Sequence, residues 1–363
     1  MRIRTLARWL PYVIVAFLAG CYAGPTALSG GASAAILPAH PTPGTSTGDL
    51  VYAVNTVTGG VMVFTYPRGT YVGGATLGAG LNGECVDARG NVFVTQTDTN
   101  ISGTIYKFKH GAVTPTAVFS DPYPSGAAAC AVNPKNGELA VVGIVPGGSG
   151  YGVVAMYEHA KGKPEILTEC CYLIDYCAYD SAGNLYLLAS DSYSNGTDFL
   201  VQIPAGTTTF EMMNTDVSIY QGGYGGPTLQ WNGGHLIVSS YLPGSQQQPS
   251  TVYAYELSVN GSTATMIHKT VLRPHAGYVG AALWVQDRKI LGFIRPRNGG
   301  ADIASWHYPD GGTPAHTFTD SYLDNEPQGL DALIVSADPA TCCYKTVFGP
   351  STTPYGMLKP PLL

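Results

Sequence analysis

The sequence predicts an all-β fold, and three observations carry that prediction. The 363 residues include 46 glycines, 26 prolines and 24 tyrosines, a mixture that suits short strands and tight turns. Only 12% of residues are charged, and no long amphipathic helical pattern is evident. An apolar stretch, a tight polar turn and a second apolar stretch also recur five times, about fifty residues apart. A repeat of that length built from short strands indicates a β-propeller with one four-stranded blade per repeat.

The five copies share a polar turn between two apolar strands. They lie at residues 85–94, 131–142, 178–188, 229–238 and 283–293. Gly90, Gly137 and Gly183 stand beside asparagines in the first three turns, and both residue types tolerate the positive φ angles of tight hairpins. We therefore expect each copy to supply the two innermost strands of one blade.

Blade two gives the expected pattern of four strands from the pore outward. Its strands are expected at Glu84–Ala88, Val92–Thr95, Thr104–Lys109 and Thr114–Phe119, and blades three to six begin at Cys130, at Cys177, near Thr228 and near Ala281. A seventh blade would have to lie inside residues 215–227 or 243–250. Six blades is therefore the expected number.

Blade one is expected to be split between the two ends of the ring. Three strands precede blade two, at Asp49–Val54, Gly60–Thr65 and Tyr71–Thr76, and they lack an inner strand. A single strand of the inner type, Gly329–Ser336, follows blade six. Its pairing with the N-terminal three would close a propeller over residues 49–338 and remove the exposed sheet edges.

The N-terminus has the pattern of a targeting segment. Arg2, Arg4 and Arg8 precede an apolar stretch that is short for a membrane span. The sequence 18–21, Leu-Ala-Gly-Cys, resembles the lipobox of bacterial lipoproteins. That resemblance implies a signal peptide over residues 1–20, a lipid on Cys21 and an extracytoplasmic place at the cell envelope. An ordinary signal peptide or an uncleaved anchor is the alternative.

Two further segments flank the expected ring. Residues 21–48 contain Cys21 and a stretch rich in Pro, Gly, Ser and Thr, which is typical of a flexible tether. Residues 339–363 form a Pro-rich tail. Position 22 is Tyr rather than Asp, which by the sorting rule of lipoproteins favours the outer membrane if the cell has one.

The eight cysteines fit an exported, oxidising setting. Without Cys21 the candidates for disulfides are Cys85, Cys130, Cys170, Cys171, Cys177, Cys342 and Cys343. Seven is odd, so at least one thiol stays unpaired or bonds outside the chain. We expect Cys85, Cys130 and Cys177 to begin inner strands at the upper mouth of the ring. Cys170 and Cys171, and likewise Cys342 and Cys343, are neighbours in the sequence. These vicinal pairs resemble the vicinal disulfide of some quinone-dependent propeller dehydrogenases, which would imply a redox role. This chain, however, lacks the tryptophan-docking motifs of those enzymes.

Phrases such as residues 179–186, Tyr-Asp-Ser-Ala-Gly-Asn-Leu-Tyr, resemble repeats of the NHL and gluconolactonase-like six-bladed propellers. The resemblance spans residues 49–338. Gluconolactonase-like enzymes hold a divalent metal through a Glu, an Asn and an Asp from different blades. Glu84 and Asp175 would supply the two carboxylates in this chain. No Asn stands at a matching inner position, since Asn133 and Asn232 lie at lower turns, and this departure counts against lactonase activity.

Propellers usually bind ligands at the upper mouth of the ring. The residues expected there are Glu84, Asp175, Tyr176, Tyr224, Tyr278, Glu326 and Gln328. Carboxylates and tyrosines around one funnel suit a cation, a sugar or a peptide. The alternative is that the tyrosines pack between blades and the carboxylates cap turns.

The function expected from the sequence is a lipid-anchored, envelope-exposed binding module without catalysis and without a cofactor. Its partners would be the membrane, through the lipid on Cys21, and an unidentified protein, glycan or small molecule. The alternative is a metal-dependent hydrolase or lyase of the lactonase type, with Ca²⁺ or Mg²⁺ at the upper mouth. The net charge of −6 and the lack of a Lys/Arg cluster exclude nucleic acid as a partner.

Overall fold

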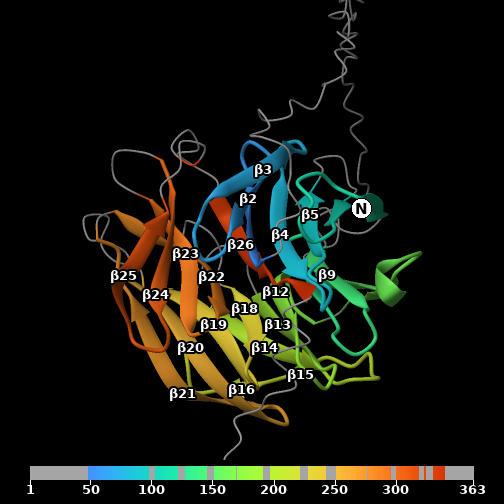
Figure 1. Cartoon of the computed structure of the whole chain (residues 1–363). Coiled ribbons are helices and arrows are strands. Elements are labelled where there is room, and N and C mark those ends of the chain that lie inside the picture. Colours follow the sequence, from blue (N-terminus) through green and yellow to red (C-terminus); the bar gives the residue numbers. More distant parts are fainter. Residues whose placement is uncertain are drawn as a thin grey trace, which may run out of the picture. The chain divides into compact units, whose positions relative to one another are not determined.

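The computed structural model describes residues 48–97, 103–121, 127–144, 151–168, 170–190, 197–220, 228–242, 251–275, 277–295, 300–318, 323 and 330–339. Nearly all of these residues belong to β-strands or to the turns between them (Figure 1). A short 3₁₀ turn at Glu158–Ala160 lies between two strands. Among the described residues there is no helix of the length and apolarity that a membrane crossing requires.

The described strands form six antiparallel blades, each with four strands in order from the inner edge outward. Blades five and six are joined at their outer strands into one nine-stranded sheet by a parallel contact between Leu272 and Gly312. Blade one consists of β26 (Leu330–Ser336), β1 (Leu50–Asn55), β2 (Gly60–Thr65) and β3 (Tyr71–Thr76). Blade two consists of β4 (Leu81–Val86), β5 (Val92–Thr97), β6 (Gly103–Phe108) and β7 (Ala117–Asp121). Blade three consists of β8 (Ala129–Val132), β9 (Leu139–Ile144), β10 (Gly152–Tyr157) and β11 (Glu165–Leu167).

The remaining three blades follow the same order. Blade four is β12 (Leu173–Tyr179), β13 (Leu185–Ser190), β14 (Thr197–Ile203) and β15 (Glu211–Met212); blade five is β18 (Leu229–Asn232), β19 (His235–Leu242), β20 (Thr251–Asn260) and β21 (Thr263–Leu272); blade six is β22 (Tyr278–Gln286), β23 (Lys289–Arg295), β24 (Asp302–His307) and β25 (Gly311–Phe318). Two short strands, β16 (Asn214–Thr215) and β17 (Ile219–Tyr220), pair with β21 and β14.

The ring is closed by β26, as expected from the sequence. Its residues pair antiparallel with β1, from Ser336 opposite Leu50 to Leu330 opposite Asn55. Around the centre each inner strand contacts the next, in the order β26, β4, β8, β12, β18 and β22, and β22 contacts β26 again. The prediction of a six-bladed propeller closed by a C-terminal inner strand is therefore confirmed.

Several inner strands begin earlier than the sequence pattern predicts. β4 begins at Leu81 rather than Glu84, and β12 begins at Leu173 rather than Cys177. β22 begins at Tyr278 rather than Ala281. The pairing register shifts within each of these strands, and a bulge interrupts the two-residue alternation on which the prediction relied.

The turns after the inner strands are held by side chains that accept backbone N–H groups. Asp87 Oδ1 accepts from the N–H of Arg89 and of Asn91, at 2.9 and 2.8 Å. Gly90 follows in the left-handed region, with φ of 74°. Asn133 and Asp180 take the place of Asp87 in blades three and four. The repeated sequence phrase therefore encodes a repeated Asx turn.

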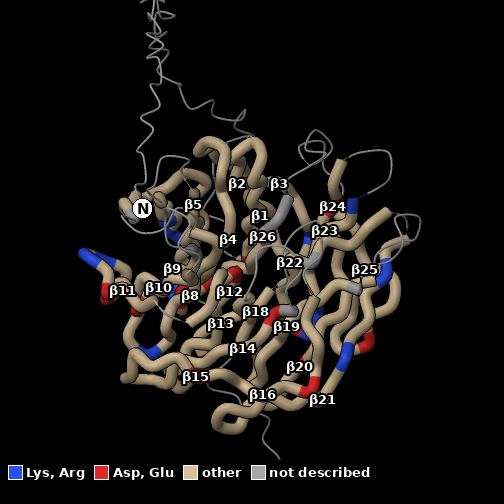
Figure 2. The backbone as a smooth tube through the Cα atoms, turned by 180° about the vertical axis from the view of Figure 1, so that it is seen from behind, with Lys and Arg blue, Asp and Glu red and all other residues tan. Residues whose placement is uncertain are grey.

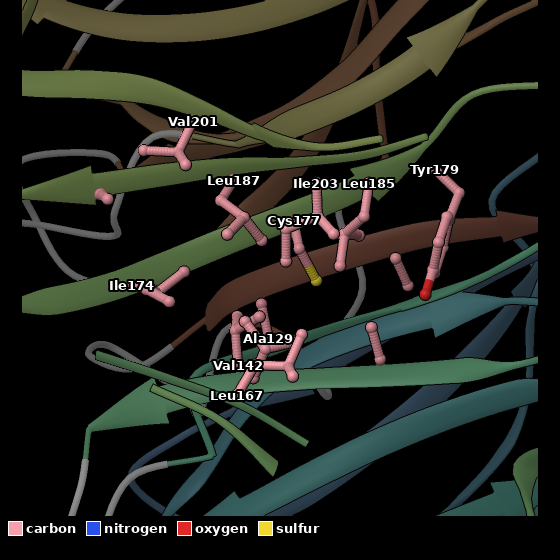
Figure 3. Close-up of a cluster of buried hydrophobic side chains, with 14 residues drawn as sticks. Ala129, Val142, Leu167, Ile174, Cys177, Tyr179, Leu185, Leu187, Val201 and Ile203 are labelled. Carbon is pink, nitrogen blue, oxygen red and sulfur yellow. The ribbon is translucent and has the colours of Figure 1, made fainter. Parts of the chain in front are cut away.

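The hydrophobic core lies between neighbouring blades. The cluster between blades three and four, shown in Figure 3, joins side chains of β8, β9 and β11 to side chains of β12, β13 and β14. Ile174 and Leu187 are fully buried in it. Charged residues are few and are scattered over the described strands and turns (Figure 2). Each blade is thus held by apolar faces on both sides, as stacked sheets require.

Candidate functional site: the central cavity

A cavity of about 460 Å³ lies at the centre of the ring. All six inner strands contribute to its wall, together with the turns that follow several of them. The volume falls within the range of about 300–1,000 Å³ that small-molecule sites occupy. The ring therefore encloses a space of the size that a small organic ligand needs.

The described wall combines aromatic and acidic side chains. Its aromatic residues are Tyr176, Tyr179, Trp231 and Trp284, and its acidic residues are Glu84, Asp87 and Asp180. The residues that line this cavity include no Lys, Arg or His. The wall is thus acidic, with flat apolar surfaces.

Glu84 is the unusual member of this wall. It follows the bulge in β4 and pairs with Val94 of β5. The residue as a whole is partly exposed, but both carboxyl oxygens are buried and have no hydrogen-bond partner among the described residues. The carboxyl group itself is therefore shielded from solvent. Burial raises the pKa of the Glu84 carboxyl well above its ordinary value of 4.5.

A second unpartnered group belongs to Trp284 of β22. Its ring packs against the cluster between blades six and one and also against the cluster between blades one and two. The indole Nε1 is buried and has no hydrogen-bond partner in the described part of the chain. The wall thus contains one acceptor-bearing side chain and one N–H donor that the described residues leave unsatisfied, and such groups cost free energy when they stay unpaired.

Asp87 and Asp180 are occupied by their own turns. Asp87 Oδ2 accepts from Asn91 Nδ2 at 2.7 Å, in addition to the two backbone bonds at Oδ1. Asp180 Oδ2 accepts from Asn184 Nδ2 at 2.7 Å and from the hydroxyl of Tyr186 at 3.0 Å. Both carboxylates therefore serve the turn structure.

Two aromatic side chains of the wall are fixed by neighbours outside it. Trp231 stacks on Tyr186, with ring centroids 5.6 Å apart and planes 6° from parallel. The hydroxyl of Tyr179 donates to Glu138 Oε1 at 2.7 Å. Burial, followed by this hydrogen bond and the nearby carboxylate, raises the pKa of Tyr179. These rings are held in place before any ligand arrives.

The seam between blades five and six is bridged by side chains of β18 and the residue before it. Gln230 donates through Nε2 to the carbonyl of Val285 at 3.0 Å and accepts its N–H through Oε1 at 2.8 Å. Thr228 Oγ1 likewise donates to the carbonyl of Leu283 at 3.2 Å and accepts its N–H at 3.3 Å. These side chains imitate the ladder of a sheet between two inner strands.

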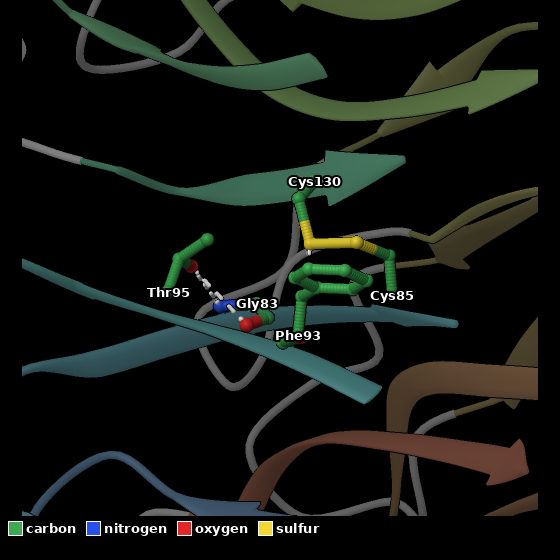
Figure 4. The surroundings of a disulfide bond; sticks show 5 residues. All are labelled: Gly83, Cys85, Phe93, Thr95 and Cys130. Carbon is green, nitrogen blue, oxygen red and sulfur yellow. Dashed lines mark hydrogen bonds between the residues drawn. A yellow bond between two sulfur atoms is a disulfide. The ribbon is translucent and has the colours of Figure 1, made fainter. Parts of the chain in front are cut away.

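A disulfide between Cys85 and Cys130 bridges the seam between blades two and three (Figure 4). The Cα atoms are 5.5 Å apart, and Phe93 packs in the same cluster. Gly83 lies close to β8, where an added Cβ would come within 2.4 Å of the Ala128 carbonyl oxygen. A glycine at position 83 therefore allows the two inner strands to approach.

The other described cysteines form a vicinal disulfide, Cys170–Cys171, and a buried free thiol, Cys177. Burial raises the pKa of this thiol, so it is not a reactive thiolate. Cys85 and Cys177 lie in the second halves of β4 and β12, and not at their beginnings as expected, because both strands start before their bulges. Cys342 and Cys343 lie outside the described residues.

The structure places the residues expected at the mouth in different positions. Glu84 and Tyr176 line the central cavity. Asp175 lies at the bulge of β12 and Tyr278 is the first residue of β22, and neither belongs to the residues that line the cavity. Tyr224, Glu326, Gln328 and the proposed lipid attachment site Cys21 lie outside the described residues.

Sequence reasoning missed Trp231 and Trp284 as wall residues. Both stand in the first strand of a repeat copy, one or two residues after the leucines Leu229 and Leu283. A large aromatic side chain in the innermost strand was the available signal, since inner strands face the pore. Among the described residues no three His, Cys, Asp or Glu side chains are grouped as they would be around a metal ion.

Comparisons with known proteins give only distant likenesses. No protein-family profile and no curated protein matches the chain. Among solved structures, a Bacteroides caccae protein of unknown function is 9% identical, covers 80% of this chain and 99% of its own, and gives a TM-score of 0.49. A 6-phosphogluconolactonase-like protein of Bacteroides uniformis is 12% identical, covers 74% and 82%, and gives 0.45. The Synechocystis apocarotenoid oxygenase is 10% identical, covers 78% and 72%, and gives 0.46.

Proposed function

We propose that this propeller is a binding module whose central cavity takes a small molecule, and that it does no chemistry on that molecule. The observation that carries the proposal is the wall itself. It encloses about 460 Å³, is built by all six inner strands, and contains two buried polar groups without partners, at Glu84 and Trp284. A ligand that supplied those partners would remove the cost of leaving them unpaired.

The rigidity of the wall also supports binding. Trp231 is stacked on Tyr186, Tyr179 is bonded to Glu138, and the disulfide ties β4 to β8. A wall that is ordered in advance loses little conformational entropy when a ligand enters, and this favours affinity.

The alternative proposal is a hydrolase or lyase of the lactonase type. Its support is Glu84, because burial raises the pKa of its carboxyl group, and carboxyl groups with raised pKa values are candidates for proton donors. Binding is preferred because the other two carboxylates of the wall are engaged in turns. Metal analysis of the purified protein, with Glu84→Ala and Asp175→Ala as variants, separates the two. Stoichiometric Ca²⁺ or Mg²⁺ that both variants lose would favour the enzyme.

Tryptophan side chains in the cavity wall can report ligand binding by fluorescence. Trp231 and Trp284 line it, whereas Trp306 is fully buried elsewhere. A ligand in the cavity should therefore change the tryptophan fluorescence. Ala332→Phe, which adds a ring to the wall from β26, should abolish the response, and the exposed Val118→Phe on β7 should not. An undiminished response in Ala332→Phe would mean that ligands bind elsewhere.

We further propose that the module is anchored to the outside of a bacterial membrane by lipid on Cys21. The support is the sequence 18–21 and the positive, apolar segment before it. Cys21→Ser should release the protein from the membrane fraction or leave the unprocessed precursor, because the acyl chains supply the anchoring free energy. Normal processing of the variant with unchanged membrane retention would contradict this proposed location.

A further inference from the structure

We infer that the ligand of the central cavity is an organic cation, a small molecule that joins an ammonium group to an apolar body. This inference rests on the proposed binding function and gives its ligand a chemical class. Its first support is the sign of the charges. Three carboxyl side chains line the cavity, and among the lining residues there is no Lys, Arg or His to neutralise them. An acidic space with low-dielectric walls concentrates cations and repels anions.

The second support is that one carboxyl group remains available. The oxygens of Asp87 and Asp180 already accept hydrogen bonds within their own turns. Among the residues that the structure describes, Glu84 has no hydrogen-bond donor at either oxygen. An ionised carboxylate that is buried without a partner is very unfavourable, and an adjacent ammonium ion is the partner that removes this cost most completely. Glu84 is therefore the anchor for the charged end of the ligand.

The geometry of Glu84 allows this role. Glu84 lines the cavity, but both of its carboxyl oxygens are buried, so the proposed binding role requires a change of side-chain rotamer that turns the carboxyl group towards the ligand.

The third support is the aromatic surface of the wall. Cations bind well over the faces of tryptophan and tyrosine rings, and the same rings cover the apolar part of an organic ligand. Tyr176, Trp231 and Trp284 supply such rings on β12, β18 and β22. Together with one carboxylate, they make a cage whose chemistry suits an amine better than a sugar or an acid.

The test uses three probes with the same ring and different charge: benzylamine, benzyl alcohol and benzoate. Each is titrated at pH 7.5 into the purified protein, with tryptophan fluorescence as the readout. We expect benzylamine to bind at least tenfold more tightly than benzyl alcohol, and benzoate to bind most weakly. Glu84→Gln should remove the preference for benzylamine and leave the affinity for benzyl alcohol unchanged.

The matched control is Glu211→Gln, which removes the same charge from an exposed position on β15. It should bind all three probes like the unaltered protein. Equal affinity for benzylamine and benzyl alcohol, a preference for benzoate, or an ammonium preference that survives Glu84→Gln would overturn the cation inference while the binding function stands. A failure of all three probes to change the fluorescence would count against the inference and the proposed function together.

Discussion

Glu84 gives the stability of the protein a distinctive dependence on pH. Burial raises the pKa of its carboxyl group in the folded state, whereas in the unfolded chain the pKa returns to its ordinary value of 4.5. Between those two values the folded state holds a proton that the unfolded state has lost. Stability therefore falls as the pH rises through this interval, by about 1.4 kcal/mol per pH unit.

Glu84→Gln should remove this dependence, because an amide has no proton to lose. The variant should gain stability over the unaltered protein as the pH is raised above 4.5, with little difference at pH 4. Urea unfolding at a series of pH values measures the difference in the free energy of unfolding between the variant and the unaltered protein. Glu211→Gln serves as the exposed control. If the difference in the free energy of unfolding between Glu84→Gln and the unaltered protein stayed constant with pH, Glu84 would be ionised in the folded protein.

Asp180 offers a second test at the residue scale. Its side chain accepts four hydrogen bonds, one of them from the hydroxyl of Tyr186, whose side chain is 2% exposed. Asp180→Ala should lower the free energy of unfolding by about 2–4 kcal/mol, because a buried hydroxyl loses its acceptor. Asp87→Ala removes the equivalent turn bonds without a tyrosine, so it should cost less. Equal losses would mean that the bond to Tyr186 contributes nothing.

Residue patterns predicted part of the wall, and the reason for the limit is physical. Glu84 and Tyr176 were expected near the pore because they stand in inner strands, and both line the cavity. Asp175 was expected beside Tyr176. A bulge at Asp175 changes which side chains face the cavity, and the spacing of residues along the chain does not reveal it.

At the scale of elements, the strands of blade one were predicted almost residue for residue. β2 and β3 have the expected bounds, and β26 differs from the expected strand by one residue. The pairing register of blade one also shifts near the starts of β3 and β26, so a bulge does not by itself displace a predicted start. The inner strands of blades two, four and six contain bulges, and there the predicted start was three or four residues late.

The disulfide between Cys85 and Cys130 joins two elements that hydrogen bonds do not pair. It closes a loop with a sequence separation of 45 residues. Replacing both cysteines by alanine should lower the free energy of unfolding by about 2–4 kcal/mol, because the unfolded chain regains the freedom of that loop. Thermal unfolding under oxidising conditions measures the loss. The single variant Cys177→Ala, which breaks no disulfide, is the control and should show a smaller loss, limited to that of a buried side chain. A double variant as stable as the unaltered protein would mean that the bond does not form.

At the scale of the whole molecule, closure of the ring makes the cavity. β26 follows blade six in the chain but pairs with β1, and it adds Ala332, Leu333 and Ile334 to the cavity wall. The sequence predicted this closure because three strands at one end and one at the other complete a single blade. It did not predict the side-chain bridges of Gln230 and Thr228, which depend on the distance between β18 and β22 in the folded ring.

The most direct test of this account is the cooperativity of unfolding after truncation. A chain that ends at Asn325 lacks β26, leaves the backbone edge of β1 unpaired and opens the cavity wall. A chain that ends at Phe348 keeps β26 and serves as the control. In urea, the control should unfold in one transition with the m-value of the full chain, and the shorter chain should aggregate or unfold with a reduced m-value. A soluble shorter chain with the midpoint and m-value of the full protein would contradict closure of the ring by residues 330–336.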